Sequence, residues 1–328
     1  MRSLARHWFV IVLTATVAVG LRWPHHFDWL IRWMDPGWNV AAVMLLNGLA
    51  LDSGQFLRSL KRPLRVLTAV FGGYLIVASL GYFASILLAP TSRDFALGLL
   101  VISAMPTTLA SAAIWTRLAG GNDAFALVVT IASNMLSFVV APMILFVTVG
   151  SLISLDPFEM VPKLVLVVIL PVVAGQALSR IGGVSSLLSR HKVVLSVLSR
   201  LLTILIVFTA VTAGVREVGV GGDHLAIYAL GILTVAVIAV HGVAAVLCWA
   251  QGKALGWGRS DRLAFVFTGA QKTLPAALYV CAEFFPTFSF ATIPCVSYHV
   301  FQLLFDSWLV EIIRTRKRRA RATESNDP

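Results

Sequence analysis

The sequence MPTTLAS at residues 105–111 decides the fold of this chain. It is rich in hydroxyl groups, yet it lies in an apolar run, 95–116, long enough to cross the roughly 30 Å hydrocarbon core of a bilayer. Because proline lacks a main-chain donor and its ring clashes with the preceding turn, we expect the helix to be interrupted at Pro106. We expect a second interruption at GAQKTLPA, residues 269–276, within the apolar run 263–283. Broken spans at matching positions of two halves indicate a transporter with a binding site at mid-membrane.

The composition places the chain in a membrane. Hydrophobic residues make up 58% of the 328 residues, charged residues make up 12%, and the mean hydropathy is +0.87. A soluble fold of this size could not bury so much apolar surface. The net charge of +11 does not indicate a nucleic-acid partner, because the basic residues stand in short clusters between apolar runs. Cys248, Cys281 and Cys295 lack the spacing of a disulfide framework or a zinc site.

Ten apolar runs are long enough to be membrane spans, so the sequence predicts an all-α integral membrane protein with ten transmembrane helices. They lie at roughly 8–22, 38–57, 66–89, 95–116, 124–149, 161–179, 193–215, 225–250, 263–283 and 288–312.

The distribution of basic residues predicts the orientation. With both termini in the cytoplasm, twenty of the 26 Lys and Arg residues, Arg200 among them, fall on the inner side and five on the outer side. This excess is typical of a multi-pass protein of the plasma (inner) membrane. The first run could instead be a signal peptide, because Arg2 and Arg6 precede it, but no A-x-A-like cleavage site follows Gly20.

The chain divides into two halves, 1–150 and 161–313, followed by a basic cytoplasmic tail, 314–328. Five runs lie in each half, so the second half enters the membrane from the opposite side and an inverted repeat is predicted, with spans four and nine broken and crossing. Weak sequence similarities support the repeat. Thr107-Thr108-Leu109-Ala110 matches Lys272-Thr273-Leu274-Pro275, and Thr130-Ile131 matches Thr292-Ile293. Thr130-Ile131 and Thr292-Ile293 are each expected to open the span after a break.

Each break implies a binding site, because unwound main chain in a bilayer leaves N–H and C=O groups unpaired unless it lines a cavity or binds a ligand. A half-helix that restarts near Thr107 directs its positive end toward the membrane centre, which suits an anion. A single hydroxyl nearby is explained as well by helix packing, but a cluster beside two breaks favours a site. The residues predicted to bind substrate or ion are Asn47, Thr107, Thr108, Ser111, Thr130, Ser133, Asn134, Thr268, Gln271, Lys272, Thr273, Tyr298, His299 and Gln302.

Lys272 carries the strongest functional signal in the chain. An ammonium group at membrane depth faces a cavity or a partner and usually serves function. Snorkelling to an interface is disfavoured, because at least nine mostly apolar residues stand on either side. No acidic residue is obviously placed to neutralise Lys272, so a bound anion could do so. Asp52 could line the same cavity or pair with basic residues of the next loop, and His241 and His299 are either packing residues or proton relays.

The breaks and the motifs around them resemble the bile acid:sodium symporter family, and within it the SBF-like branch, which contains an orphan vertebrate solute carrier. The matching motifs are Met105-Pro106, Gly120-Gly121-Asn122, Lys272-Thr273-Leu274, and Tyr298-His299 with Gln302. The resemblance covers residues 5 to 313.

The resemblance implies a core domain (spans three to five and eight to ten), a panel domain (spans one, two, six and seven), and alternating access between them. It also implies organic anions as substrates and sodium as the coupling ion, with Ser111, Thr130 and Gln271 at positions that match sodium ligands. The family pattern Glu-x-Gly-x-Gln-Asn, however, is replaced here by Phe267 to Lys272. Without the carboxylate, and with an ammonium group beside the site, sodium binding is disfavoured.

The sequence therefore predicts a secondary transporter of an organic anion, such as a bile acid, a sterol sulfate or a small carboxylate. Lys272 or protons would replace sodium, and no cofactor other than a sodium ion is suggested. Two other classes stay open: a transport-inactive regulatory or channel-like protein, kept open by the altered sodium site, and a membrane enzyme. An enzyme is disfavoured because no metal, nucleophile-elbow or phosphate-loop motif is present. The sequence does not indicate the oligomeric state, the direction of transport or which anion binds.

Overall fold

The structure is a computed structural model that describes residues 4–50, 63–109, 111–149, 155–182, 188, 190–218 and 224–324. The described residues form helices and no strands. In the first half these are α1 (Leu4–Arg22), the short turns η1 (Pro24–Phe27) and α2 (Asp28–Trp33), α3 (Pro36–Ala50), α5 (Pro63–Leu88), α6 (Arg93–Ala104), α7 (Ser111–Leu118) and α8 (Asp123–Val149). In the second half they are α9 (Pro157–Leu164), a π-helical turn (Val165–Ile169), α10 (Leu170–Leu178), α12 (Lys192–Val218), α13 (His224–Ala254), α14 (Arg259–Ala270), α15 (Leu274–Phe284) and α16 (Thr292–Glu324).

The fold is that of a multi-pass membrane protein. Five uninterrupted helical stretches in the described residues are long and apolar enough to cross a membrane: Pro63–Leu88, Asp123–Val149, Pro157–Leu178, Val193–Ala213 and Tyr228–Ala254. Helix also lies within each of the five other predicted runs, in shorter or less apolar pieces. The two interrupted runs are among them, because each is divided into half-helices of 8 to 12 residues.

Both predicted interruptions are present in the structure. Helix α6 ends at Ala104 and α7 begins at Ser111, so residues 105–109 are non-helical around Pro106. At the second interruption only residues 271–273 are non-helical, so this break is shorter than the predicted one at 269–276. Pro275 does not interrupt α15, because it occupies the first turn of that helix, where its missing N–H would have no helical partner in any case.

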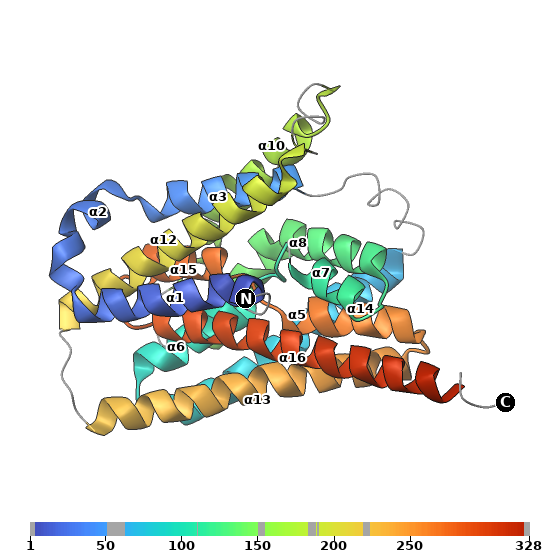
Figure 1. Cartoon of the computed structure of the whole chain (residues 1–328). Helices are drawn as coiled ribbons and strands as arrows, with labels where there is room; N and C mark the ends of the chain where they lie inside the picture. Colours follow the sequence, from blue (N-terminus) through green and yellow to red (C-terminus); the bar gives the residue numbers. More distant parts are fainter. Residues whose placement is uncertain are drawn as a thin grey trace.

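The helices pack in two groups. Helix α3 packs against α10 and α12 in the upper part of Figure 1, and α12 packs against α1 below them. Helix α5 packs against α6, α8, α13 and α14, and α16 packs against α6 and α13. Helix α15 lies between α12 and this second group, because it contacts α12 on one side and α16 and α6 on the other. The non-helical residues of both interruptions therefore lie in the interior of the bundle.

Close helix contacts in the second group depend on glycines. A Cβ on Gly73 of α5 would lie 2.8 Å from the Cα of Gly269 in α14, so these two helices approach backbone to backbone. A Cβ on Gly98 of α6 would lie 2.0 Å from the carbonyl oxygen of Ala291, which precedes α16. Only residues without a Cβ fit at such distances.

The two halves are also joined near the ends of the half-helices. Asp261, in the first turn of α14, accepts hydrogen bonds from Asn122 (2.8 Å) and from Arg65 (2.7 Å). Asp94, in the first turn of α6, accepts a 2.9 Å hydrogen bond from the main-chain N–H of Phe290. In each case a carboxylate in the first turn of a half-helix accepts a hydrogen bond from the segment just before the long helix of the other half. Asn122 precedes α8, and Phe290 precedes α16.

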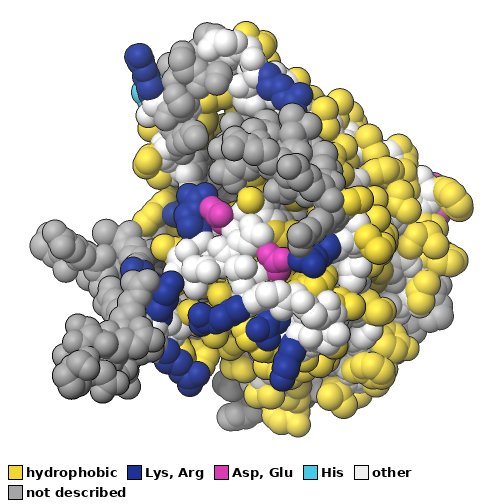
Figure 2. All heavy atoms as spheres, turned by 90° about the vertical axis from the view of Figure 1, so that its right-hand side faces the viewer, with side chains coloured by type: hydrophobic (Ala, Val, Ile, Leu, Met, Phe, Trp, Pro, Cys, Tyr) yellow, Lys and Arg dark blue, Asp and Glu magenta, His cyan; other side chains and the backbone are white. Residues whose placement is uncertain are grey.

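Basic side chains gather at the end of the molecule where α5 and α14 begin and the C-terminus lies (Figure 2). Exposed Arg117, Arg259 and Arg316 lie in helices that end or begin here.

Two sequence predictions concern single residues elsewhere in the fold. Asp52 lies outside the described residues. Thr130 was expected to open a helix, but α8 begins seven residues earlier, at Asp123. Thr292 does begin α16, as expected.

Candidate functional site

The two interruptions touch each other. The main-chain N–H of Thr273, in the second break, donates a 2.9 Å hydrogen bond to the carbonyl oxygen of Pro106, in the first. Thr273 also precedes the first residue of α15, with extended φ and ψ of −82° and 125°. The unwound strands of the two halves are therefore hydrogen-bonded to each other inside the bundle, where no water is needed to satisfy them.

Side chains of α8 satisfy the main chain of the first break. Ser133 Oγ accepts a 3.3 Å hydrogen bond from the N–H of Thr107, and Asn134 Nδ2 donates a 2.9 Å bond to the Thr107 carbonyl. Asn134 also donates to the carbonyl of Thr130, one turn earlier in its own helix. The predicted cluster Thr107, Thr130, Ser133 and Asn134 is thus buried and brought together at the first break.

The second break is satisfied in the same way by α16. Gln302 Oε1 accepts a 2.9 Å hydrogen bond from the N–H of Lys272, and Gln302 Nε2 donates a 2.9 Å bond to the Lys272 carbonyl. His299 Nδ1 lies 2.8 Å from Gln302 Nε2 and fixes the orientation of that amide. Lys272 therefore occupies in the second break the position that Thr107 occupies in the first.

The Lys272 side chain lies in the interior, with only 3% of the residue exposed. Its Nζ lies 4.7 Å from the centre of the Tyr74 ring, which belongs to α5. Tyr74 is itself held by a 3.0 Å hydrogen bond from its hydroxyl to the Ser133 carbonyl. Within the described part of the chain no carboxylate forms an ion pair with Lys272, so the aromatic face is the partner of the ammonium group.

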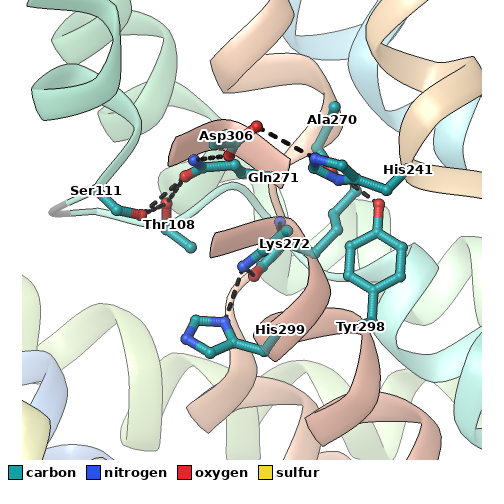
Figure 3. A network of polar contacts seen from close by, with 10 residues as sticks. Thr108, Ser111, His241, Ala270, Gln271, Lys272, Tyr298, His299 and Asp306 are labelled. Carbon is teal, nitrogen blue, oxygen red and sulfur yellow. Dashed lines mark hydrogen bonds and ion pairs between the residues drawn. The ribbon is translucent and has the colours of Figure 1, made fainter. Parts of the chain in front are cut away.

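Gln271 links the first break to a buried carboxylate (Figure 3). Its Oε1 accepts hydrogen bonds from Thr108 (2.5 Å) and Ser111 (2.8 Å), and its Nε2 donates a 2.5 Å bond to Asp306 in α16. The other oxygen of Asp306 lies 3.2 Å from Nε2 of His241, in α13. Both Asp306 and His241 are almost completely buried.

The remaining predicted residues serve the main chain or stand alone. The Tyr298 hydroxyl donates a 2.9 Å hydrogen bond to the carbonyl of Ala270, the last residue of α14. Thr268 donates to the Ala264 carbonyl of its own helix and so contributes no group to the site. The hydroxyls of Thr107 and Thr130 are buried without a partner among the described residues.

A cavity of about 230 Å³ opens between the first helix group and the half-helices. Its polar lining comes from Asn47 of α3, Ser199, Arg200 and Thr203 of α12, Thr108 and Ser111 at the first break, Thr273 at the second break, and His299 of α16. Its apolar lining is Phe9, Val43, Leu109, Ile114, Trp115, Pro275 and Leu303. Asn47 is oriented by Ser199, whose hydroxyl donates a 3.0 Å hydrogen bond to it.

A second cavity, of about 210 Å³, lies further along the same helices α12 and α15. The first cavity reaches Thr203 and Pro275, whereas the second begins at Ile206 and Leu278, one helical turn beyond. A layer about one turn thick, roughly 5 Å, separates the two cavities along this helix pair.

The residues at sodium-matching positions are only partly brought together. Ser111 and Gln271 are hydrogen-bonded, but the Thr130 hydroxyl forms no hydrogen bond with either. Phe267, where the family pattern has a carboxylate, is buried in the apolar core beside α16. The described residues also hold no cluster of three His, Cys, Asp or Glu side chains arranged for a metal ion.

Sequence reasoning missed Arg200, Tyr74 and the role of Asp306. Arg200 was counted as a basic residue of an inner loop, but it lies in α12 and lines the cavity. Asp306 lies near the end of the predicted tenth span, yet it stands four residues, about one turn, after Gln302 on the same face of α16. That spacing is the signal that could have found it.

Comparison with known proteins gives one family. A model of the SBF-like CPA transporter family matches residues 7–315. Sodium/bile acid cotransporter 7 of Danio rerio is 24% identical over 323 residues, which cover 94% of each chain. The probable sodium/metabolite cotransporter BASS4, chloroplastic, of Oryza sativa subsp. japonica is 28% identical over 236 residues, 68% of this chain and 56% of the relative. An uncharacterized Pseudomonas aeruginosa protein is 27% identical over 235 residues, 71% and 69% of the two chains.

Proposed function

This chain belongs to the SBF-like CPA transporter family, as its motifs predicted, and we propose that it is a secondary active transporter of a small organic anion that works by alternating access. The observation that carries the proposal is the 2.9 Å main-chain hydrogen bond between the two breaks, beside a cavity lined by both of them. Interrupted helices that meet in the interior create a polar site at membrane depth, and secondary transporters bind their substrates at such sites.

We propose that the ten helical runs form two inverted five-helix repeats. Two pairs of matching contacts support this arrangement. Thr107 and Lys272 are each held at N–H and C=O by the long helix that follows the break. Asp94 and Asp261 each begin a half-helix and hold the segment before the long helix of the other half. Such reciprocal contacts are expected of repeats related by a pseudo-two-fold axis in the membrane plane.

Alternating access would occur between a panel (spans one, two, six and seven) and a core (spans three to five and eight to ten). The helix groups support this division, because the first cavity has α1, α3 and α12 on one side and both breaks on the other. The second cavity on the same pair of helices supports access from the opposite side. A shift of the core by about one helical turn along α12 would exchange which cavity receives the substrate.

We infer that Lys272 replaces the coupling cation. Its buried ammonium group lies against Tyr74, next to Gln271, the residue that is kept from the family's sodium pattern. A positive charge here repels sodium and makes a bound cation unnecessary for holding the broken helices. Protons remain a second candidate for coupling, since the His241–Asp306 pair connects to the site through Gln271.

Uptake into proteoliposomes tests the anion, the coupling and the role of Lys272 together. We expect the wild-type protein to accumulate at least one small organic anion without a sodium gradient, and Lys272→Ala to lose that uptake. The matched control is Lys253→Ala, at the exposed end of α13. Uptake that depends fully on an imposed sodium gradient, and that Lys272→Ala retains, would remove the proposal for Lys272.

Cysteine labelling tests alternating access itself. The native cysteines are buried, so Thr203→Cys and Thr209→Cys place single accessible thiols in the first and second cavity, respectively. In inside-out and right-side-out vesicles, a membrane-impermeant maleimide should label the two positions from opposite sides. If both positions react from one side only, under all substrate conditions, the alternating mechanism is wrong.

The second candidate function is a transport-inactive regulatory or channel-like protein on the same fold. The altered sodium position, with Phe267 where the family pattern has a carboxylate, is the observation that favours it. Saturable uptake of the anion against its own concentration gradient would support the transporter, because a channel does not accumulate its ion against a gradient. For localisation we propose the inner membrane with both termini in the cytoplasm, supported by the basic face in Figure 2.

A further inference from the structure

The first cavity carries a positive charge that sequence reasoning did not assign to it. Among its described lining residues Arg200 is the one Lys or Arg side chain, and none is an Asp or Glu. Ser199 and Thr203, on either side of Arg200 along α12, line the same cavity. The residue therefore belongs to a polar face of α12 that lines the cavity, where Arg200 is exposed and Ser199 and Thr203 are buried.

Two aromatic rings of α1 hold the guanidinium. Its central carbon lies 5.8 Å from the centre of the Phe9 ring and 6.0 Å from that of Trp8. Within the described residues no carboxylate is paired with it. Contact with ring faces restrains a guanidinium while leaving the N–H donors at its edge available. Phe9 also contacts His299 edge to face, with ring centres 6.3 Å apart, so one ring connects Arg200 to the second break.

The dimensions of the cavity indicate the size of ligand that it encloses. Its volume is about 230 Å³, and it is open on one side. A carboxylate or sulfonate on one ring or on a short chain fits inside, whereas the four fused rings of a sterol would extend through the opening and leave most of their apolar surface outside. The apolar side chains of Ile114, Trp115 and Leu303 provide contacts for such a carbon skeleton.

We propose that Arg200 binds the acid group of the substrate and that the cavity selects small organic monoanions and dianions over bile acids and sterol sulfates. This inference rests on the proposed transport function and names its substrate class. The guanidinium donates two parallel hydrogen bonds to a carboxylate or sulfonate, a geometry that a lysine cannot reproduce. Across the cavity, Thr108 and Ser111 donate to Gln271 and so accept from a hydroxyl group at the other end of the substrate, and Thr273 lies beside them.

Thermal-shift measurements on the purified full-length protein in detergent test the proposal. The probes are hexanoate, phenylacetate, benzenesulfonate and glutarate, the neutral amides of the first two, and taurocholate. The variants are Arg200→Gln, Arg200→Lys and, as a matched control, Arg93→Gln, which removes an arginine that does not line the cavity. Uptake of any binding probe into proteoliposomes is measured in parallel.

We expect at least one small anion to raise the melting temperature of the wild-type protein, while its amide and taurocholate do not. Arg200→Gln should weaken the apparent affinity for that anion at least tenfold, Arg200→Lys less, and Arg93→Gln not at all. The comparison of acid with amide needs no variant, so it decides the question even if Arg200→Gln does not fold.

Four results would overturn the proposal. Equal shifts with acid and amide, or unchanged anion binding in Arg200→Gln, would refute the role of Arg200 while uptake still supports the transport function. Tighter binding of taurocholate than of every small anion would refute the size limit. If the wild-type protein neither binds nor takes up any probe, both this inference and the proposed function are refuted.

Discussion

The N–H of Thr273 and the carbonyl oxygen of Pro106 form a 2.9 Å hydrogen bond that joins the two broken segments of the chain. The two residues are 167 positions apart in the sequence. The first break is therefore sensitive to any displacement of the second, because the Pro106 carbonyl would lose its hydrogen-bond donor.

Thr273→Pro should uncouple the breaks. Its φ of −82° is close to the roughly −65 ± 15° that proline adopts, so the main change is loss of the N–H. A buried carbonyl left without its donor costs about 1–3 kcal/mol. We expect a lower melting temperature and loss of uptake. Thr273→Ala, which removes the side chain but keeps the N–H, is the control, and equal stability of the two variants would contradict the prediction.

Tyr74 should act through its ring. Tyr74→Phe keeps the aromatic face over Lys272 and loses only the hydrogen bond to Ser133, whereas Tyr74→Leu removes the face. A desolvated cation–π contact contributes about 2 kcal/mol. We therefore expect Tyr74→Leu to reduce uptake more than tenfold and Tyr74→Phe less than tenfold. Similar uptake rates in the two variants would show that the ring face is not what positions the ammonium group.

Asp306→Asn should impair transport without preventing folding. Asparagine keeps the shape but weakens the hydrogen bond from Gln271, which orients the Gln271 oxygen toward Thr108 and Ser111. A hydrogen bond to a charged group contributes about 1.5–3 kcal/mol. We expect a modest loss of stability in denaturation and a tenfold or larger fall in uptake. The prediction fails if Asp306→Asn transports at the wild-type rate.

Gly98→Ala should be strongly destabilising. The new Cβ would lie 2.0 Å from the main-chain oxygen of Ala291, so α6 and the start of α16 must separate. The matched control is Gly231→Ala in α13, where a Cβ meets nothing within 4 Å and a gain of about 0.5–1 kcal/mol in helix stability is expected. Yield and melting temperature in detergent compare the two, and equal values would mean that this contact is not close.

The breaks were predictable from the sequence: Pro106 with its hydroxyl neighbours marks the first, and the polar residues 271–273 inside an apolar run mark the second. The echo between Thr107 and Lys272 comes from the order of similar residues in the two halves, and each residue is held at N–H and C=O by a later helix. The echo between Thr130 and Thr292 was misleading, since two-residue matches carry little information. Thr130 lies inside α8 and Thr292 begins α16.

The positions of Arg200 and Asp306 could not be read in this way. A basic residue eight positions after the start of a helix looks like an interfacial charge in a count of loops, and only the rotation of α12 against the breaks directs it into the cavity. Likewise, the contact between Asp306 and Gln271 depends on the crossing of α16 and α14. Helix rotation and crossing are set by packing among segments distant in sequence, which one sequence does not display.

The amides of Asn134 and Gln302 pair the unwound main chain on both sides, so its donors and acceptors are met by the protein itself. These hydrogen bonds do not depend on a substrate to hold the opened helices together. On the proposed transport function, a carrier built in this way would make its return stroke unloaded, supporting net flux in one direction without a counter-solute.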